Sequence, residues 1–166
     1  MKTFIFSLVF SISLFAAQNA KNLDILKMNN KFNGLILVTT DNNWKNKWET
    51  SSDEIPKFNE TKKIKKGQHL SILTFFSNPK VNQSVADIIC DIQLVKPNGE
   101  YEVNEKNVTC FKGTLKGPTH NVYLAGPVLE FVGEKSDPKG KWVINITLKD
   151  NIGNASVSLK SSFELK

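Results

Sequence analysis

Apolar and polar residues alternate most strictly in the last stretch of the chain, which reads KWVINITLKDNIGNASVSLKSSFELK. The apolar positions that fall on one side of an extended backbone are Trp142, Ile144, Ile146, Leu148, Ala155, Val157, Leu159, Phe163 and Leu165. A period of two is typical of a β-strand with one buried face, and DNIGN supplies turn residues between the two runs. The pattern predicts an antiparallel pair of strands with one dry and one wet face, as a β-sandwich requires.

The segment ADIICDIQLVKPNGEYEV predicts a second hairpin. Its alternating apolar positions are Ile88, Cys90, Ile92 and Leu94. KPNGE combines Pro, Asn and Gly, which favour a tight reversal of the chain. Cys90 is therefore expected to point into the core.

Further short apolar runs bring the number of expected strands to about seven. These runs are GLILVTT, HLSILTFFS, NVTCFKG, the stretch 128–132 and a short strand near Phe58 or Ile64. Turn-rich segments separate them, and no helical period is sustained. The fold class that fits is all-β, most simply an immunoglobulin-like antiparallel β-sandwich. A small barrel stays open as an alternative, because the number of strands does not decide whether the sheets close.

One short helix is expected within DNNWKNKW. Asp41 is a suitable N-cap, and Trp44 and Trp48 are four residues apart, so one or two helical turns place both indoles on one side. Such a helix is too short to be stable alone and must pack on another element. With Lys45 and Lys47 beside them, the two indoles form the candidate partner-binding surface, whereas the other aromatic residues are expected to fill the core.

The first 17 residues have the order of a secretory signal peptide. One Lys precedes an apolar run from Phe4 to Phe15, and small and polar residues follow it. We expect cleavage after Ala17, which leaves residues 18–166 as a single domain, periplasmic or secreted. The alternative is an uncleaved anchor, although the apolar run is short for a membrane span. No later apolar run is long enough for a membrane helix, so no span is expected after cleavage.

Two cysteines, Cys90 and Cys110, agree with export. In an oxidising compartment an isolated pair most simply forms a disulfide. Closing a loop of this size stabilises a domain by roughly 3 kcal/mol in the chain-entropy model. The alternative, a redox or metal pair, lacks the adjacent C-x-x-C spacing.

The formal net charge is +6, and Lys2 leaves with the signal peptide. The lysines are scattered except for Lys62, Lys63, Lys65 and Lys66. A scatter of this kind is typical of a solvated surface, so no nucleic-acid partner is expected. Binding of a polyanion through Lys62 to Lys66 stays open as an alternative function.

The residues do not form a recognisable catalytic or cofactor-binding motif. The sequence contains no G-x-S-x-G elbow, Walker loop or G-x-G-x-x-G. His69 and His120 are the only imidazoles, so a triad or a three-histidine zinc site is not expected. We therefore assign no catalytic residue, no metal and no cofactor. The alternative is a small enzyme or metal-binding protein that uses His69 or His120 with nearby acids.

The stretch GKWVINITLKDNIGNASVSLKSSFEL resembles the final two strands of many bacterial immunoglobulin-like modules. The region from WKNKW through GQHLSILTFFSNP to the two cysteines is similar to small exported bacterial proteins without an assigned activity. The resemblance implies a fold and an exported location, and it implies no functional residues. In antibody-type domains the disulfide joins the two sheets at a much longer sequence separation, so that role is not carried over to Cys90 and Cys110.

These observations predict an exported module without enzymatic activity. Its scaffold would bind another protein or an envelope component of a bacterium through loops or an edge strand.

Overall fold

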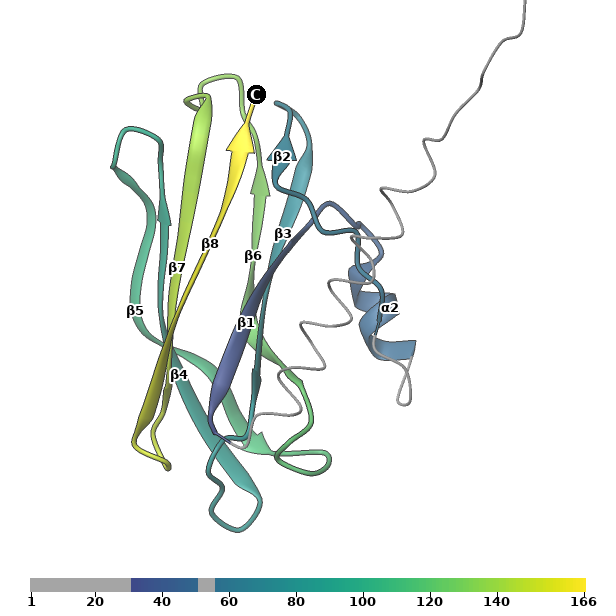
Figure 1. Cartoon of the computed structure of the whole chain (residues 1–166), viewed down its shortest axis with the longest axis vertical. Helices are drawn as coiled ribbons and strands as arrows, with labels where there is room; N and C mark the ends of the chain where they lie inside the picture. Colours follow the sequence, from purple (N-terminus) through teal and green to yellow (C-terminus); the bar gives the residue numbers. More distant parts are fainter. Residues whose placement is uncertain (1–30, 51–55) are drawn as a thin grey trace, which may run out of the picture.

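The structure, a computed structural model, describes residues 31–50 and 56–166 and is an all-β sandwich with one short helix (Figure 1). This confirms the fold class predicted from the sequence. The elements are β1 (Asn33–Thr39), α2 (Trp44–Thr50), β2 (Lys63–Ile64), β3 (His69–Ser77), β4 (Val85–Val95), β5 (Tyr101–Thr114), β6 (Tyr123–Val132), β7 (Gly140–Asp150) and β8 (Ala155–Leu165).

The strands pair in two separate sheets. One has three strands in the order β1-β3-β6, and the other has five in the order β2-β8-β7-β4-β5. The described residues therefore form two layers rather than a closed barrel. The structure adds two details to the prediction. Residues 31–50 and 56–166 contain eight strands, where about seven were expected, and the short β2 pairs in parallel with β8 at Lys63–Glu164 and Ile64–Leu165.

The core lies between the two sheets and follows the alternation seen in the sequence. Every second residue of β4 and β7 is buried, including Ile88, Cys90, Trp142 and Ile144, each 0% exposed. Where β1 passes β8, Gly34 permits close packing. A Cβ there would lie 2.5 Å from Leu148 Cδ1 and 3.0 Å from Leu159 Cδ1 of the opposite sheet, so a side chain at this position would crowd the contact between the two layers.

The three-stranded sheet is apolar on both faces, which explains why eight consecutive residues of β3 are buried. Its inner face contributes to the core, and its outer face packs against α2 and the segment around Phe58. The outer cluster consists of Leu37, Trp44, Phe58, Leu73 and Phe75. The short helix thus packs on a sheet, as its length requires.

The predicted disulfide is present. Cys90 of β4 and Cys110 of β5 are joined across neighbouring strands of the five-stranded sheet, with their Cα atoms 5.8 Å apart. Both are buried within the main core. The bond thus holds the edge strand β5 against β4 and does not link the two sheets.

The two ends of the sandwich differ in what they carry. The upper end in Figure 1 contains residues 62–68, the β4–β5 turn (96–100), the β6–β7 loop (133–139) and the C-terminus. The lower end contains the loops 78–84 and 115–122 and the β7–β8 turn (151–154). The predicted signal peptide lies outside the described residues. Among the described residues, no helix has the length and apolar character needed to cross a bilayer.

Asp150 organises the lower end. This residue is 2% exposed, and its carboxylate accepts hydrogen bonds from the backbone N–H groups of Lys80 (2.7 Å), Ile152 (3.1 Å) and Gly153 (2.9 Å). The bonds from Ile152 and Gly153 shape the turn after β7, and the bond from Lys80 connects that turn to the β3–β4 loop. One buried acceptor group thus holds two segments that are distant in the sequence.

Replacing Asp150 with alanine is expected to lower the free energy of unfolding by about 2 kcal/mol, because three backbone donors lose a charged acceptor. Urea denaturation followed by circular dichroism measures the change. Asp150→Asn is the matched control, since its amide oxygen retains part of the network, and it should lose less. Equal stability of Asp150→Ala and the unmodified protein would contradict this role.

Candidate binding surfaces

A cleft opens between the two sheets at the upper end, where the edge strands β5 and β6 face each other. It has a volume of about 300 Å³. We call it the β5–β6 cleft. Its apolar lining is Leu94, Val103, Leu129, Phe131 and Val132, and its carboxyl groups belong to Glu102, Glu130, Glu134 and Asp137.

The apolar lining continues into the core, whereas the carboxylates stand at the mouth. Leu94 is 3% and Phe131 8% exposed, and Val103 and Leu129 pack against the main cluster. By contrast, the side chains of Glu102 and Glu130 are 43% and 42% exposed. The β5–β6 cleft therefore combines an apolar floor with an acidic rim.

The topology explains why the cleft lies at this end. Near the lower end, the ring of Phe111 lies 5.4 Å from that of Phe76 and 6.3 Å from that of Tyr123, so aromatic side chains fill the space between β5 and the three-stranded sheet. Towards the upper end, the corresponding inward position of β5 is Val103, a much smaller side chain. The smaller side chain leaves the space between β5 and β6 open at this end, and this space is the cleft.

Two contacts set the electrostatics of the rim. Lys96 Nζ lies 2.8 Å from a carboxylate oxygen of Glu102, and this bond raises the pKa of Lys96. Glu130 accepts a hydrogen bond from Ser71 Oγ at 2.7 Å, and the same oxygen lies 2.9 Å from His69 Nε2. Glu134 and Asp137 add two further carboxylates without a salt bridge among the described residues.

Both strands that border the cleft are poor templates for another strand. β5 carries exposed charged side chains such as Glu105 and Lys106, and its pairing with β4 shifts register at three points. In β6, Pro127 has no backbone N–H, and the pairing with β3 is irregular between Ile72 and Thr74. Charges, bulges and proline all discourage edge-to-edge pairing.

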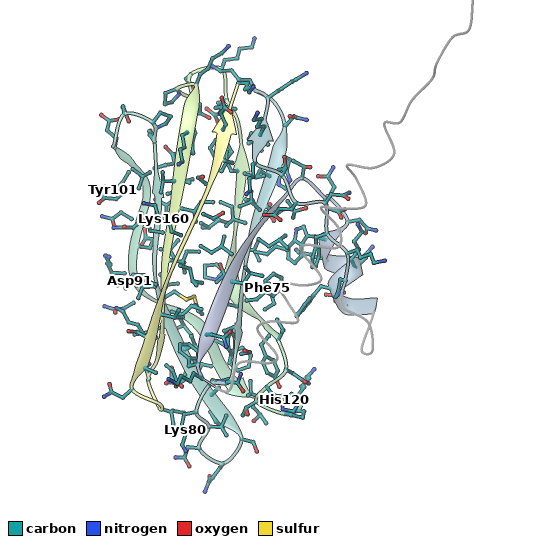
Figure 2. The ribbon with its side chains drawn as sticks, in the orientation of Figure 1. Phe75, Lys80, Asp91, Tyr101, His120 and Lys160 are labelled. Atoms are coloured by element: carbon teal, nitrogen blue, oxygen red, sulfur yellow. A yellow bond between two sulfur atoms is a disulfide. The ribbon has the colours of Figure 1, made fainter. Side chains whose placement is uncertain are left out.

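The outer face of the five-stranded sheet is a hydrogen-bonded polar surface. Asp91, labelled in Figure 2, accepts a hydrogen bond from the Asn107 backbone N–H at 3.0 Å and lies 2.9 Å from Lys149 Nζ. These two contacts, the first above all, lower the pKa of Asp91. The face has the paired charges of a solvated surface.

The structure places the two histidines at opposite ends of the sandwich. His69 begins β3 at the upper end (Figure 1), and His120 lies in the loop at the lower end (Figure 2). The imidazole of His69 contacts the carboxylate of Glu130. The hydroxyl of Ser71 donates a hydrogen bond to the same carboxylate and not to the imidazole, so the three side chains do not form a serine–histidine–acid relay. Within residues 31–50 and 56–166, no group of three His, Cys, Asp or Glu side chains is arranged to hold a metal ion.

The two tryptophans of α2 face the sheet. Trp44 is 6% exposed, and the ring of the half-buried Trp48 lies 5.1 Å from that of Phe75. Lys47 pairs with Asp41, and Lys45 lies 5.5 Å from the centre of the Trp44 ring. Both indoles thus share one side of the helix, as expected, and that side is packed. Partner binding by this helix stays a prediction.

No local pattern in the sequence indicates the β5–β6 cleft. Its four carboxyl groups come from three segments spread between Glu102 and Asp137, and no local spacing connects them. The exposed carboxylates of β5 and the β6–β7 loop become neighbours only because these segments lie at the same end of two opposed sheets. A correct assignment of β5 and β6 as edge strands would have been the one available signal.

Comparisons with known proteins do not identify a family. No protein-family model and no curated protein matches the chain. Solved structures share a distant likeness at 12–15% identity. A family 123 glycoside hydrolase from Clostridium perfringens has 12% identity and a TM-score of 0.46 over 82% of this chain. The alkylpurine DNA glycosylase AlkC from Pseudomonas fluorescens, bound to DNA containing an abasic site analog, has 12% and 0.44 over 93%. A Niemann-Pick type C2 protein from the Japanese carpenter ant has 15% and 0.43 over 81%.

The chain spans 27% and 36% of the lengths of the first two structures and 91% of the third. At these identities and TM-scores the likeness assigns no family to the chain. The resemblance to exported bacterial proteins with an immunoglobulin-like domain therefore stays a prediction.

Proposed function

We propose that the chain is an exported, non-enzymatic binding module that holds a basic side chain of a partner protein in the β5–β6 cleft. The observation that carries this proposal is the apolar floor of Leu94, Val103, Leu129 and Phe131 beneath a rim of four carboxyl groups. The signal-like N-terminus supports export to the periplasm or the medium.

The chemistry of the cleft suits a lysine or arginine side chain. Such a side chain has an aliphatic stem that gains from apolar contact and a cationic head that gains from carboxylates. In the cleft, Phe131 and Leu129 would contact the stem, and Glu134 and Asp137 would receive the head. A partner strand added to β5 or β6 is less suited, because both edges carry the features that discourage pairing.

Titration of the ¹⁵N-labelled protein with n-hexylammonium tests the proposal, because this probe has the stem and the head of a basic side chain and nothing else. The expected result is a saturable shift of the amide resonances of Val103 and Leu129. The double variant Glu102→Gln/Glu134→Gln should weaken binding at least about fivefold, since two charged acceptors are lost.

Two controls decide the outcome. The variant Glu49→Gln/Glu105→Gln removes the same charge from exposed residues outside the cleft lining and should bind as the unmodified protein does. Hexanoate has the same apolar stem with the opposite charge and should leave the cleft resonances unchanged. Equal shifts with hexanoate, or shifts outside the cleft only, would overturn the proposal.

A further inference from the structure

The upper end also gathers lysines on the side opposite to the β5–β6 cleft. We call this group the β2 lysine patch; it consists of Lys62, Lys63, Lys65, Lys66, Lys135 and Lys166. In the five-stranded sheet, β2 and β5 form opposite edges. Four strand spacings separate these edges by roughly 19 Å. The lysines of residues 62–66 and Lys166 are therefore separated from the β5 wall of the cleft, whereas Lys135 lies in the β6–β7 loop between Glu134 and Asp137 of the cleft lining.

Backbone contacts hold the patch together. Glu164 N–H donates to the Lys62 carbonyl at 2.8 Å, and Lys166 N–H donates to the Ile64 carbonyl at 3.0 Å, so the end of β8 lies beside β2. Gly67 N–H donates to the Gly133 carbonyl at 2.7 Å. The ammonium group of Lys66 also donates to the Lys135 carbonyl. Three segments that are distant in the sequence thus present their lysines together.

The positive charge of the patch is not neutralised by ion pairs. Five of its lysines are exposed and Lys66 is half-buried. In the part of the chain that the structure describes, none of the six forms a salt bridge, whereas Lys47, Lys96, Lys106, Lys112 and Lys149 each pair with an acid. The segments that carry the six lysines contain four carboxylate side chains, those of Glu60, Glu134, Asp137 and Glu164.

The surroundings of the patch favour one class of polyanion. Proteins that bind single-stranded nucleic acids stack bases on exposed aromatic rings. Here the nearby rings of Phe131 and Phe163 are buried. An anionic membrane is disfavoured because the exposed apolar residues of this end, Tyr101 and Val132, lie beside Glu102 and Glu130. A flexible anionic polysaccharide needs neither exposed aromatic rings nor an exposed apolar surface, because lysines alone can bind its charged groups.

We propose that the β2 lysine patch binds an anionic polysaccharide. Binding depends on several lysines that contact the polymer at once. When these lysines neutralise the charges of the polymer, its bound counterions are released. Binding should therefore weaken steeply as the salt concentration rises. The proposal for the patch does not depend on the proposal for the cleft, because the two are tested with probes of opposite charge.

Fluorescence anisotropy with labelled dextran sulfate tests this inference on the full mature protein, with neutral dextran as the uncharged probe. We expect binding to dextran sulfate alone. The variant Lys63→Gln/Lys65→Gln/Lys135→Gln should bind at least tenfold more weakly. The matched variant Lys80→Gln/Lys116→Gln/Lys160→Gln loses the same charge from exposed lysines elsewhere and should weaken binding less than twofold. Thermal unfolding checks that both variants are folded.

Three results would overturn the inference. Equal losses in the two variants would show that net charge alone drives binding. Absence of binding to dextran sulfate at low salt would exclude a polyanion site. Tighter binding to single-stranded DNA or to phosphatidylglycerol vesicles than to dextran sulfate, at equal salt, would assign the patch to a different class of partner.

Discussion

Replacing Trp142 with alanine should lower the free energy of unfolding by about 4 kcal/mol, because a large side chain is removed from a packed core. Trp142 is 0% exposed, and its ring centroid lies 4.9 Å from that of Phe131 and 6.0 Å from that of Phe163. Phe131 belongs to the three-stranded sheet and the other two rings to the five-stranded sheet, so the cluster joins the two layers near the upper end.

Trp142→Phe provides the graded comparison. It retains a ring in the cluster but loses the hydrogen bond from Nε1 to the Pro138 carbonyl, which measures 3.1 Å. We expect a loss of about 1.5 kcal/mol for this variant, from one hydrogen bond and a partial cavity. Urea denaturation followed by far-ultraviolet circular dichroism measures both. Losses below 1 kcal/mol for Trp142→Ala would show that the ring cluster does not hold the layers together.

The alternation of apolar residues was sufficient to predict β4, β7 and the inward position of Cys90, because each of these strands has one face in the core. The same rule describes β3 poorly. Both faces of β3 are buried, so its run from Leu70 to Phe76 lacks a period, although it was still recognisable as a strand from its composition. The spacing of the tryptophans predicted the helix correctly, whereas the prediction of Asp41 as its N-cap was wrong. The helix begins at Trp44, and Asp41 accepts from the backbone N–H of Asn43 at 3.4 Å, within the turn that precedes the helix.

Features that depend on the relative placement of strands were not predictable from local patterns. The parallel contact of β2 with β8 joins residues about a hundred positions apart. The sequence places Asp150 at a turn, and only the structure shows that its carboxylate also accepts a hydrogen bond from Lys80 N–H. The β5–β6 cleft and the β2 lysine patch arise in the same way, since each collects side chains from three or more segments at one end. Local sequence reports which face a residue takes, and topology decides which residues become neighbours.

The disulfide stabilises the edge strand β5, which borders the β5–β6 cleft. Cys90 is 0% and Cys110 6% exposed, and the bond crosses from β4 to the edge strand β5, which forms one wall of the cleft. β5 has a hydrogen-bonded neighbour on one side only and shows register shifts along its pairing with β4. An edge strand of this kind is the first part of a sheet to open, so a covalent tie near its middle affects both global and local stability.

The variant Cys90→Ala/Cys110→Ala should lose about 3 kcal/mol of stability, because the cysteines are 20 residues apart and their bond restricts the unfolded chain. Alanine avoids placing a hydroxyl in the core, so the loss does not include a buried unsatisfied group. Urea denaturation measures the change. Hydrogen exchange separates its two parts: faster exchange confined to β5 would indicate local opening, and a uniform increase would indicate global destabilisation. We expect both, with the larger effect in β5. A variant as stable as the disulfide-bonded protein would contradict a structural role for the bond, and unchanged exchange in β5 would contradict its role in supporting the wall of the cleft.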